Sequence, residues 1–176
     1  MVVLNRLLPT DSPKRVGKME PKFITVHEVS LGTDVQPAEK NYQRYYNLLF
    51  ETPTSVGYHF LVEANHGEDT RIYQFLETDV ATHHTGNKTG NVQSIGIERM
   101  VNVVTDMERA INAQAQLVAT LMKTYNIPLH HVVPHKFWSG KQCPARLLAG
   151  MYGGWNGFIE RVKYYFEKQD FIERVL

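Results

Sequence analysis

The sequence predicts an α/β protein with a single mixed central β-sheet flanked by amphipathic helices. Short apolar segments typical of strands alternate with longer segments whose apolar residues recur every three or four positions. This mixture favours helices packed on a mixed sheet. The 176 residues contain no internal repeat and no linker long enough to separate two domains. We therefore expect one domain over residues 1–176, with its core at about 20–168.

The first half of the chain predicts three strands and one helix. Residues 23–26 are mostly apolar and indicate a short buried strand. Pro37 is a favoured first helical residue, and aromatic and apolar residues follow at helical spacing, so we expect a helix over residues 37–50. Residues 58–64 and 71–76 have the composition of strands and are joined by a polar turn.

The middle of the chain predicts a loop that leads into a strand. Residues 81–93 are polar and show no periodicity, which indicates an irregular loop of the kind that often carries function. Residues 94–98 alternate strictly between two sets of side chains. Two isoleucines point to one face of this strand, whereas Gly96 and Glu98 point to the other.

The last part of the chain predicts two long helices with a strand between them. Thr105 and Glu108 have the spacing of a capping box, and apolar positions then continue to a helix end near Asn126. Residues 132–133 indicate a short strand. A second amphipathic helix begins near Trp155.

The composition excludes several classes of protein. The net charge of +1 is too small for a typical nucleic-acid-binding domain, and the single cysteine allows no internal disulfide. The apolar N-terminal stretch is short and is interrupted by Arg6, so no signal peptide is predicted, and no apolar run is long enough to span a membrane. We expect neither nucleic acid nor a membrane as partner, and the sequence does not define an oligomeric state.

Three residues at strand ends and in loops are candidates for a metal site. His27 follows the strand over residues 23–26, although a single histidine in such a place is more often structural. His135 and Cys143 are eight positions apart, and this pair fits a zinc site, a Cys-His nucleophile pair or a structural cysteine about equally well. With His27 as a third ligand, the set would leave one position for water, as in catalytic zinc sites. Pro144 fits the first turn of a helix, whose dipole would favour the Cys143 thiolate.

Glu98 is a candidate general base. Gly96 leaves space on the strand face from which the Glu98 carboxylate projects. A carboxylate beside a zinc-activated water can take its proton and pass it to a leaving group. For an isolated glutamate, a solvated position on a sheet face is the commoner case.

Four motifs occur in an order that resembles a known family. Residues 24–27 read ITVH, residues 57–60 read GYHF, residues 91–98 read NVQSIGIE, and residues 135–144 begin with histidine and end with QCP. This pattern resembles the type 2 N-acetylmuramoyl-L-alanine amidases, which include phage endolysins, bacterial autolysins and peptidoglycan recognition proteins. Residues 138–141 are especially similar to phage and Bacillus-type members.

The resemblance implies a zinc hydrolase that cleaves the amide between N-acetylmuramic acid and L-alanine of peptidoglycan. It implies that His27, His135 and Cys143 bind one zinc ion per chain at one edge of the sheet. Glu98 would then be the general base, and Lys141 would help to stabilise the oxyanion.

The resemblance also implies roles for two further residues. Tyr58 matches a tyrosine that supports catalysis in members without the glutamate. His84 matches a histidine of the substrate groove, and its neighbour His83 would point the opposite way in an extended chain. Two alternatives stay open: a metal-independent Cys-His thiol hydrolase and a non-catalytic peptidoglycan-binding module.

A cell-wall hydrolase without a signal peptide fits a phage or prophage endolysin. We expect such an enzyme to be made in the host cytoplasm and to act on the wall after release. No wall-binding domain is expected within this chain.

Overall fold

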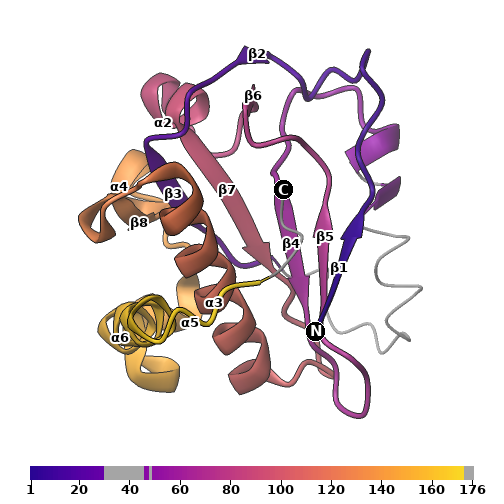
Figure 1. The fold of residues 1–176 in the computed structure, drawn as a ribbon. Helices are drawn as coiled ribbons and strands as arrows, with labels where there is room; N and C mark the ends of the chain where they lie inside the picture. Colours follow the sequence, from indigo (N-terminus) through magenta and orange to yellow (C-terminus); the bar gives the residue numbers. More distant parts are fainter. Residues whose placement is uncertain (30–45, 48, 173–176) are drawn as a thin grey trace.

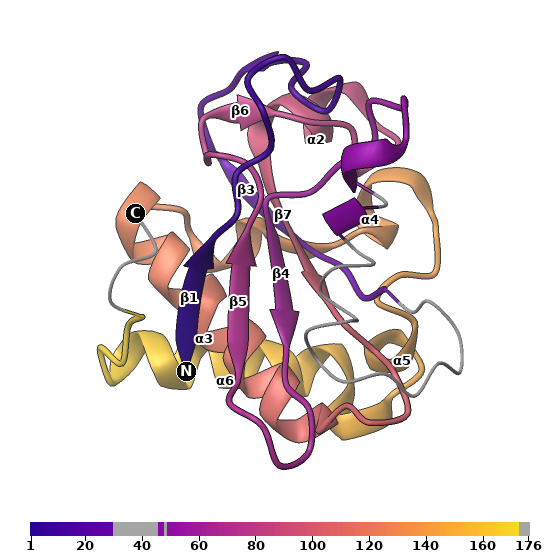
Figure 2. The same cartoon turned by 90° about the vertical axis from the view of Figure 1, so that its right-hand side faces the viewer.

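The computed structural model describes residues 1–29, 46–47 and 49–172, and its centre is a six-stranded mixed sheet (Figure 1). One pair of neighbouring strands is antiparallel and the other pairs are parallel. The sheet order is β1 (Val2–Asn5), β5 (Arg71–Gln74), β4 (Phe60–Glu63), β7 (Ser94–Arg99), β3 (Phe23–Val26) and β8 (Val132–Pro134). Figure 2 shows β1, β5 and β4 side by side. The predicted fold class is confirmed.

Two long helices lie on one side of this sheet (Figure 1). They are α3 (Met107–Tyr125) and α6 (Gly154–Glu167). Ile95 and Ile97 of β7 join the apolar faces of both helices in one buried cluster, as the alternation of this strand predicts. Burying apolar area in this cluster provides the main stabilisation of the sheet–helix packing.

A smaller apolar cluster lies apart from this core. Leu8 from the N-terminal segment packs there with Leu61, Tyr73 and Phe75 from the sheet. Lys14 from the same N-terminal segment is fully buried, and its ammonium donates hydrogen bonds to the backbone carbonyls of Thr52 and Thr54. The N-terminal segment thereby holds the chain that leads to Tyr58 against the sheet.

The cap of α3 differs from the predicted capping box. Asp106 is the N-cap, and its carboxylate accepts a hydrogen bond from the backbone N–H of Arg109. The Thr105 hydroxyl instead accepts from the backbone N–H of Asn102, and Glu108 pairs with Arg161 at 2.8 Å. The helix ends as predicted, at a left-handed Asn126.

Other elements differ from the prediction or add to it. The expected loop over residues 81–93 begins with the last residue of β6 (Val80–Ala81), which pairs with β2 (Gly17–Lys18), and ends with α2 (Lys88–Gln93). The Asn87 side chain caps α2, and a helix of six residues is too short to show apolar periodicity in the sequence. The strand β1 is also new, and it pairs with β5 in a parallel arrangement. The short helices are η1 (Leu129–His131), α4 (Lys136–Ser139), α5 (Ala145–Leu148) and η2 (Met151–Gly153).

Most of the helix expected over residues 37–50 lies outside the described residues, although residues 46–47 and 49–51 are helical. No helix in the described parts of the chain is both long and apolar enough to cross a membrane.

Candidate functional site

The register of three parallel strands brings three of the predicted site residues together. Val26, the last residue of β3, is opposite Ile97 of β7 on one side and opposite Pro134 of β8 on the other. The residue after each of these is His27, Glu98 and His135, respectively. Parallel strands present their carboxyl ends at the same edge, so these side chains meet there.

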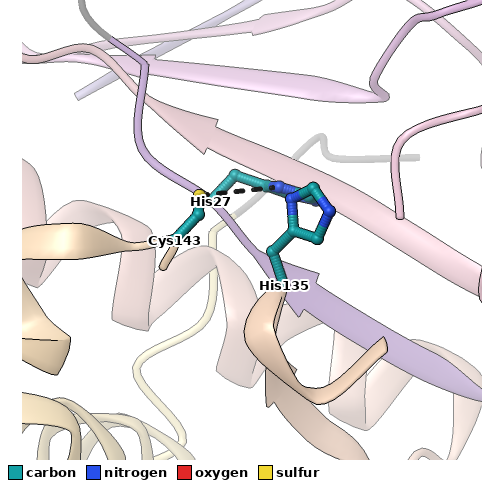
Figure 3. A group of neighbouring side chains, drawn as sticks. All are labelled: His27, His135 and Cys143. Carbon is teal, nitrogen blue, oxygen red and sulfur yellow. Dashed lines mark hydrogen bonds between the residues drawn. The ribbon is translucent and has the colours of Figure 1, made fainter. Parts of the chain in front are cut away.

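Cys143 reaches the same place from the loop after α4 (Figure 3). Its Sγ lies 3.9 Å from Nδ1 of His27 and 3.8 Å from the backbone carbonyl oxygen of Glu28. The backbone N–H of Lys136 donates to the Cys143 carbonyl and closes the loop. One ligand atom each from His27, His135 and Cys143 lies within 4.8 Å of the other two, and all three residues are buried.

This donor set fits a zinc ion. Two imidazoles and one thiolate are ligands that zinc prefers, and three protein ligands leave a fourth position open. With Zn–N of about 2.1 Å and Zn–S of about 2.3 Å, two ligands of a tetrahedral ion are about 3.6 Å apart. The observed 3.9 Å between Nδ1 of His27 and Sγ of Cys143 is close to that value. The buried Nδ1 of His135 has no hydrogen-bond partner among the described residues, which leaves it available to a metal.

Glu98 and Lys141 lie beside these ligands. Oε1 of Glu98 is 3.9 Å from Nδ1 of His27, and 15% of the Glu98 side chain is exposed. Burial raises the pKa of Glu98 to about 8, while the positive charges of Lys141 and Arg99 act in the opposite direction. A nearby cation favours the ionised carboxylate, so a bound metal would lower this pKa.

The surroundings of Cys143 differ from the sequence prediction. Pro144 is the N-cap and α5 begins at Ala145, with only four residues in the helix. Burial, followed by the charge of Glu98, raises the pKa of the Cys143 thiol to about 11. Burial thus opposes formation of the thiolate, whereas a bound metal ion would favour it.

The adjacent residues His83 and His84 have different side-chain partners, although both border the same cavity. Nδ1 of His84 is 3.0 Å from Nε2 of His27, and Nε2 of His84 is 3.0 Å from the backbone carbonyl oxygen of Ser94. Burial lowers the pKa of His84 to about 3. His83 instead contacts the Ser55 hydroxyl near the surface. His84 therefore borders the cavity but lies behind His27.

A buried polar network that the sequence prediction missed supports the ligands. The Glu28 carboxylate accepts from Arg99 at 2.7 Å and from the backbone N–H of Arg146 at 3.1 Å. Arg99 donates to Gln114 of α3, whose amide donates to the backbone carbonyls of His27 and Ile97. The network thus ties the end of β3 to α3 and to the start of α5. The only sign of it in the sequence is that Glu28 and Arg99 directly follow the candidate site residues His27 and Glu98.

One cavity joins the predicted site residues. It has a volume of about 900 Å³, which is in the range of ligand-binding sites. Tyr58 borders it and packs edge-on against Phe75. All seven residues that the sequence singles out line this cavity, namely His27, Tyr58, His84, Glu98, His135, Lys141 and Cys143.

Comparisons with known proteins identify the family of this chain. Residues 17–146 match the family described as N-acetylmuramoyl-L-alanine amidase. The amidase CwlH of Bacillus subtilis is 38% identical over 92% of this chain and 62% of its own length. The amidase XlyA of the same species is also 38% identical, over 86% of this chain and 52% of its own length. The chain thus spans somewhat more than half the length of these relatives.

Solved structures of an amidase catalytic domain and of an endolysin are also similar to this chain. The catalytic domain of XlyA has a TM-score of 0.75 and 36% identity, covering 91% of this chain and 98% of that one. A mutant endolysin from Bacillus subtilis has a TM-score of 0.78 and 36% identity, covering 92% and 99% of the two chains. The family resemblance predicted from the four sequence motifs is confirmed, and this chain belongs to the N-acetylmuramoyl-L-alanine amidase family.

Proposed function

We propose that this protein is a zinc-dependent hydrolase that cleaves the amide between the lactyl group of N-acetylmuramic acid and L-alanine in bacterial peptidoglycan. The observation that carries the proposal is the convergence of His27, His135 and Cys143, whose ligand atoms lie within 4.8 Å of one another. Family membership over residues 17–146 supports the choice of reaction.

His27, His135 and Cys143 would hold one zinc ion per chain. Zinc at this place supplies Lewis acidity, which lowers the pKa of a water molecule and polarises the scissile carbonyl. All three residues line the cavity, so a substrate bound there could reach an ion that they held.

Glu98 is placed to move the proton of the hydrolysis. Its carboxylate lies beside His27 at the cavity wall, so it can take a proton from the attacking water and deliver it to the leaving amine. Lys141 is exposed at the same wall and can donate a hydrogen bond to the developing oxyanion. Such a donor is typically worth about 3–4 kcal/mol in the transition state. Tyr58 would shape the wall rather than transfer protons.

The substrate places this activity at the bacterial cell wall. We propose that the protein is made in the host cytoplasm and reaches the wall after release, in line with the endolysin among its structural relatives. The described residues act as one catalytic domain in this proposal.

The thiol-hydrolase alternative is less consistent with the site. A nucleophilic cysteine needs a lowered pKa, whereas burial raises that of Cys143 to about 11. A non-catalytic module would not need Glu98 and Lys141 beside a complete ligand set.

Product analysis of digested peptidoglycan tests the proposal. We expect new N-terminal alanine without new reducing sugar ends, loss of activity with a chelator, and recovery when zinc is restored. New reducing ends alone would identify a glycosidase instead. Activity that survives chelation but is lost on thiol alkylation would favour the thiol hydrolase.

A further inference from the structure

We propose that His84 is a positioning residue that holds His27 in the tautomer with an unprotonated Nδ1 facing the metal. This inference rests on the proposed zinc site and assigns His84 a role other than substrate binding. It follows from a chain of hydrogen bonds that begins at a backbone carbonyl and ends at the ligand atom.

The first link is the contact between His84 and β7. Nε2 of His84 lies 3.0 Å from the backbone carbonyl oxygen of Ser94. A carbonyl oxygen can only accept, so Nε2 of His84 carries the proton. A neutral imidazole has one N–H, and Nδ1 of His84 is therefore a hydrogen-bond acceptor.

The second link is the contact between the two histidines. Nδ1 of His84 lies 3.0 Å from Nε2 of His27. Because Nδ1 of His84 accepts, Nε2 of His27 donates, and the lone pair of His27 is left on Nδ1. Nδ1 is also the atom that lies 3.9 Å from Sγ of Cys143. Histidine ligands of metals usually donate their second N–H to a fixed partner in this way.

Gly96 makes room for this arrangement. A Cβ at position 96 would lie 2.7 Å from Nδ1 of His84 and 3.0 Å from its Cγ, closer than real contacts allow. The space that the sequence suggested for the Glu98 carboxylate is therefore filled by the His84 ring. The backbone N–H of Gly96 is fixed in turn by Nδ1 of His59 at 2.9 Å.

The tautomers can be read directly by nuclear magnetic resonance. Long-range ¹H–¹⁵N correlation spectra of the metal-free wild type, with labelled histidine and near neutral pH, should show His27 and His84 protonated at Nε2. Protonation of His27 at Nδ1 in the folded wild type would overturn the proposal, and this measurement needs no variant.

Zinc affinity, measured by competition with a chromophoric chelator, tests the consequence. His84→Leu removes the acceptor and should weaken zinc binding about 10–100-fold, the usual effect of losing a partner of a ligand. His84→Asn places a carbonyl oxygen near the position of Nδ1 and should recover most of the loss. Gly96→Ala should weaken binding in the same direction as His84→Leu.

Gln74→Leu is a matched control. Gln74 is as buried as His84, at 8% exposure, and also donates to a backbone carbonyl, but it does not line the cavity. We expect it to leave zinc affinity unchanged. A folded His84→Leu variant that binds zinc as tightly as the wild type would overturn the inference. A wild type that binds no zinc would contradict the proposed function, and this inference with it.

Discussion

The carboxylate of Glu28 pairs with the guanidinium of Arg99 at 2.7 Å, directly beside the candidate ligand His27. The Arg99 side chain is fully buried and that of Glu28 is 7% exposed. The other Glu28 oxygen accepts from the backbone N–H of Arg146. One carboxylate therefore neutralises a buried cation and fixes the segment that follows Cys143.

Glu28→Gln should strongly destabilise the fold. The substitution keeps the shape but leaves the Arg99 charge buried without a counter-charge, a change that typically costs about 3–5 kcal/mol. Urea denaturation measures the loss in the free energy of unfolding.

Glu160→Gln is the control for this prediction. Glu160 pairs with Lys163 at 2.6 Å, but both side chains are largely exposed, so the pair contributes little. Adding Arg99→Met to Glu28→Gln should restore part of the stability, because the unpaired charge is then removed. If Glu28→Gln and Glu160→Gln lowered the free energy of unfolding equally, the buried pair would contribute no more to stability than the exposed pair.

Local sequence patterns predicted the helices and strands of this fold better than they predicted which distant residues contact one another. The alternation of residues 94–98 placed Ile95 and Ile97 on one face of the strand, and both lie in the buried core, because alternation within a single strand decides the face of each side chain. The Glu28–Arg99 pair joins residues 71 positions apart, and only the pairing of β3 with β7 brings them together. No local pattern contains that information.

In the candidate site, too, the sequence indicated which residues belong to the site but not how they contact one another. The family resemblance pointed to seven residues that all border one cavity. The place of His84 behind His27 depends on the path of an irregular segment over Gly96, and such a segment has no periodicity to interpret. The resemblance suggested a groove residue, and the structure places His84 at the cavity with its Nδ1 3.0 Å from Nε2 of the candidate ligand His27.

The N-cap of α3 is Asp106 rather than the predicted Thr105, and two substitutions test this assignment. Asp106→Ala removes the acceptor for the Arg109 N–H and should cost about 0.5–2 kcal/mol of stability. Asp106→Asn keeps an acceptor and should cost much less. Thermal unfolding compares the two variants, and equal melting temperatures would mean that Asp106 is not the effective cap.

Glu63 should make stability depend on pH. Burial raises the pKa of Glu63 from 4.5 to about 7, although hydrogen bonds from Tyr73 and Asn65 act against this. Between these two pH values the folded protein keeps a proton that the unfolded chain releases. The contribution of Glu63 to the free energy of unfolding therefore falls as pH rises through this interval and stays constant above it.

Glu63→Gln isolates this contribution. Its amide mimics the protonated carboxyl, because the N–H group can donate to the Tyr73 hydroxyl and the oxygen can accept from Asn65. The variant should match the wild type near pH 4.5 and exceed its stability above pH 7, by on the order of 1–3 kcal/mol. Glu20→Gln, at an exposed position, should leave the pH profile unchanged. Parallel profiles for Glu63→Gln and the wild type would contradict the prediction.

Glu98→Gln separates proton transfer from metal binding. The glutamine keeps the size of the side chain but cannot accept a proton from water, so turnover on peptidoglycan should fall by about 10²–10⁴-fold. Zinc content should stay at one per chain, because Glu98 is not in the set formed by His27, His135 and Cys143. The two measurements are the release of N-terminal alanine and the metal content of the purified variant.

Glu108→Gln provides the comparison for Glu98→Gln, since Glu108 is an exposed residue of α3 that does not line the cavity. It should retain wild-type turnover and zinc. Near-normal turnover of Glu98→Gln would assign the proton transfer to another group. Loss of zinc together with activity would instead mean that the carboxylate, 3.9 Å from Nδ1 of His27, helps to hold the metal.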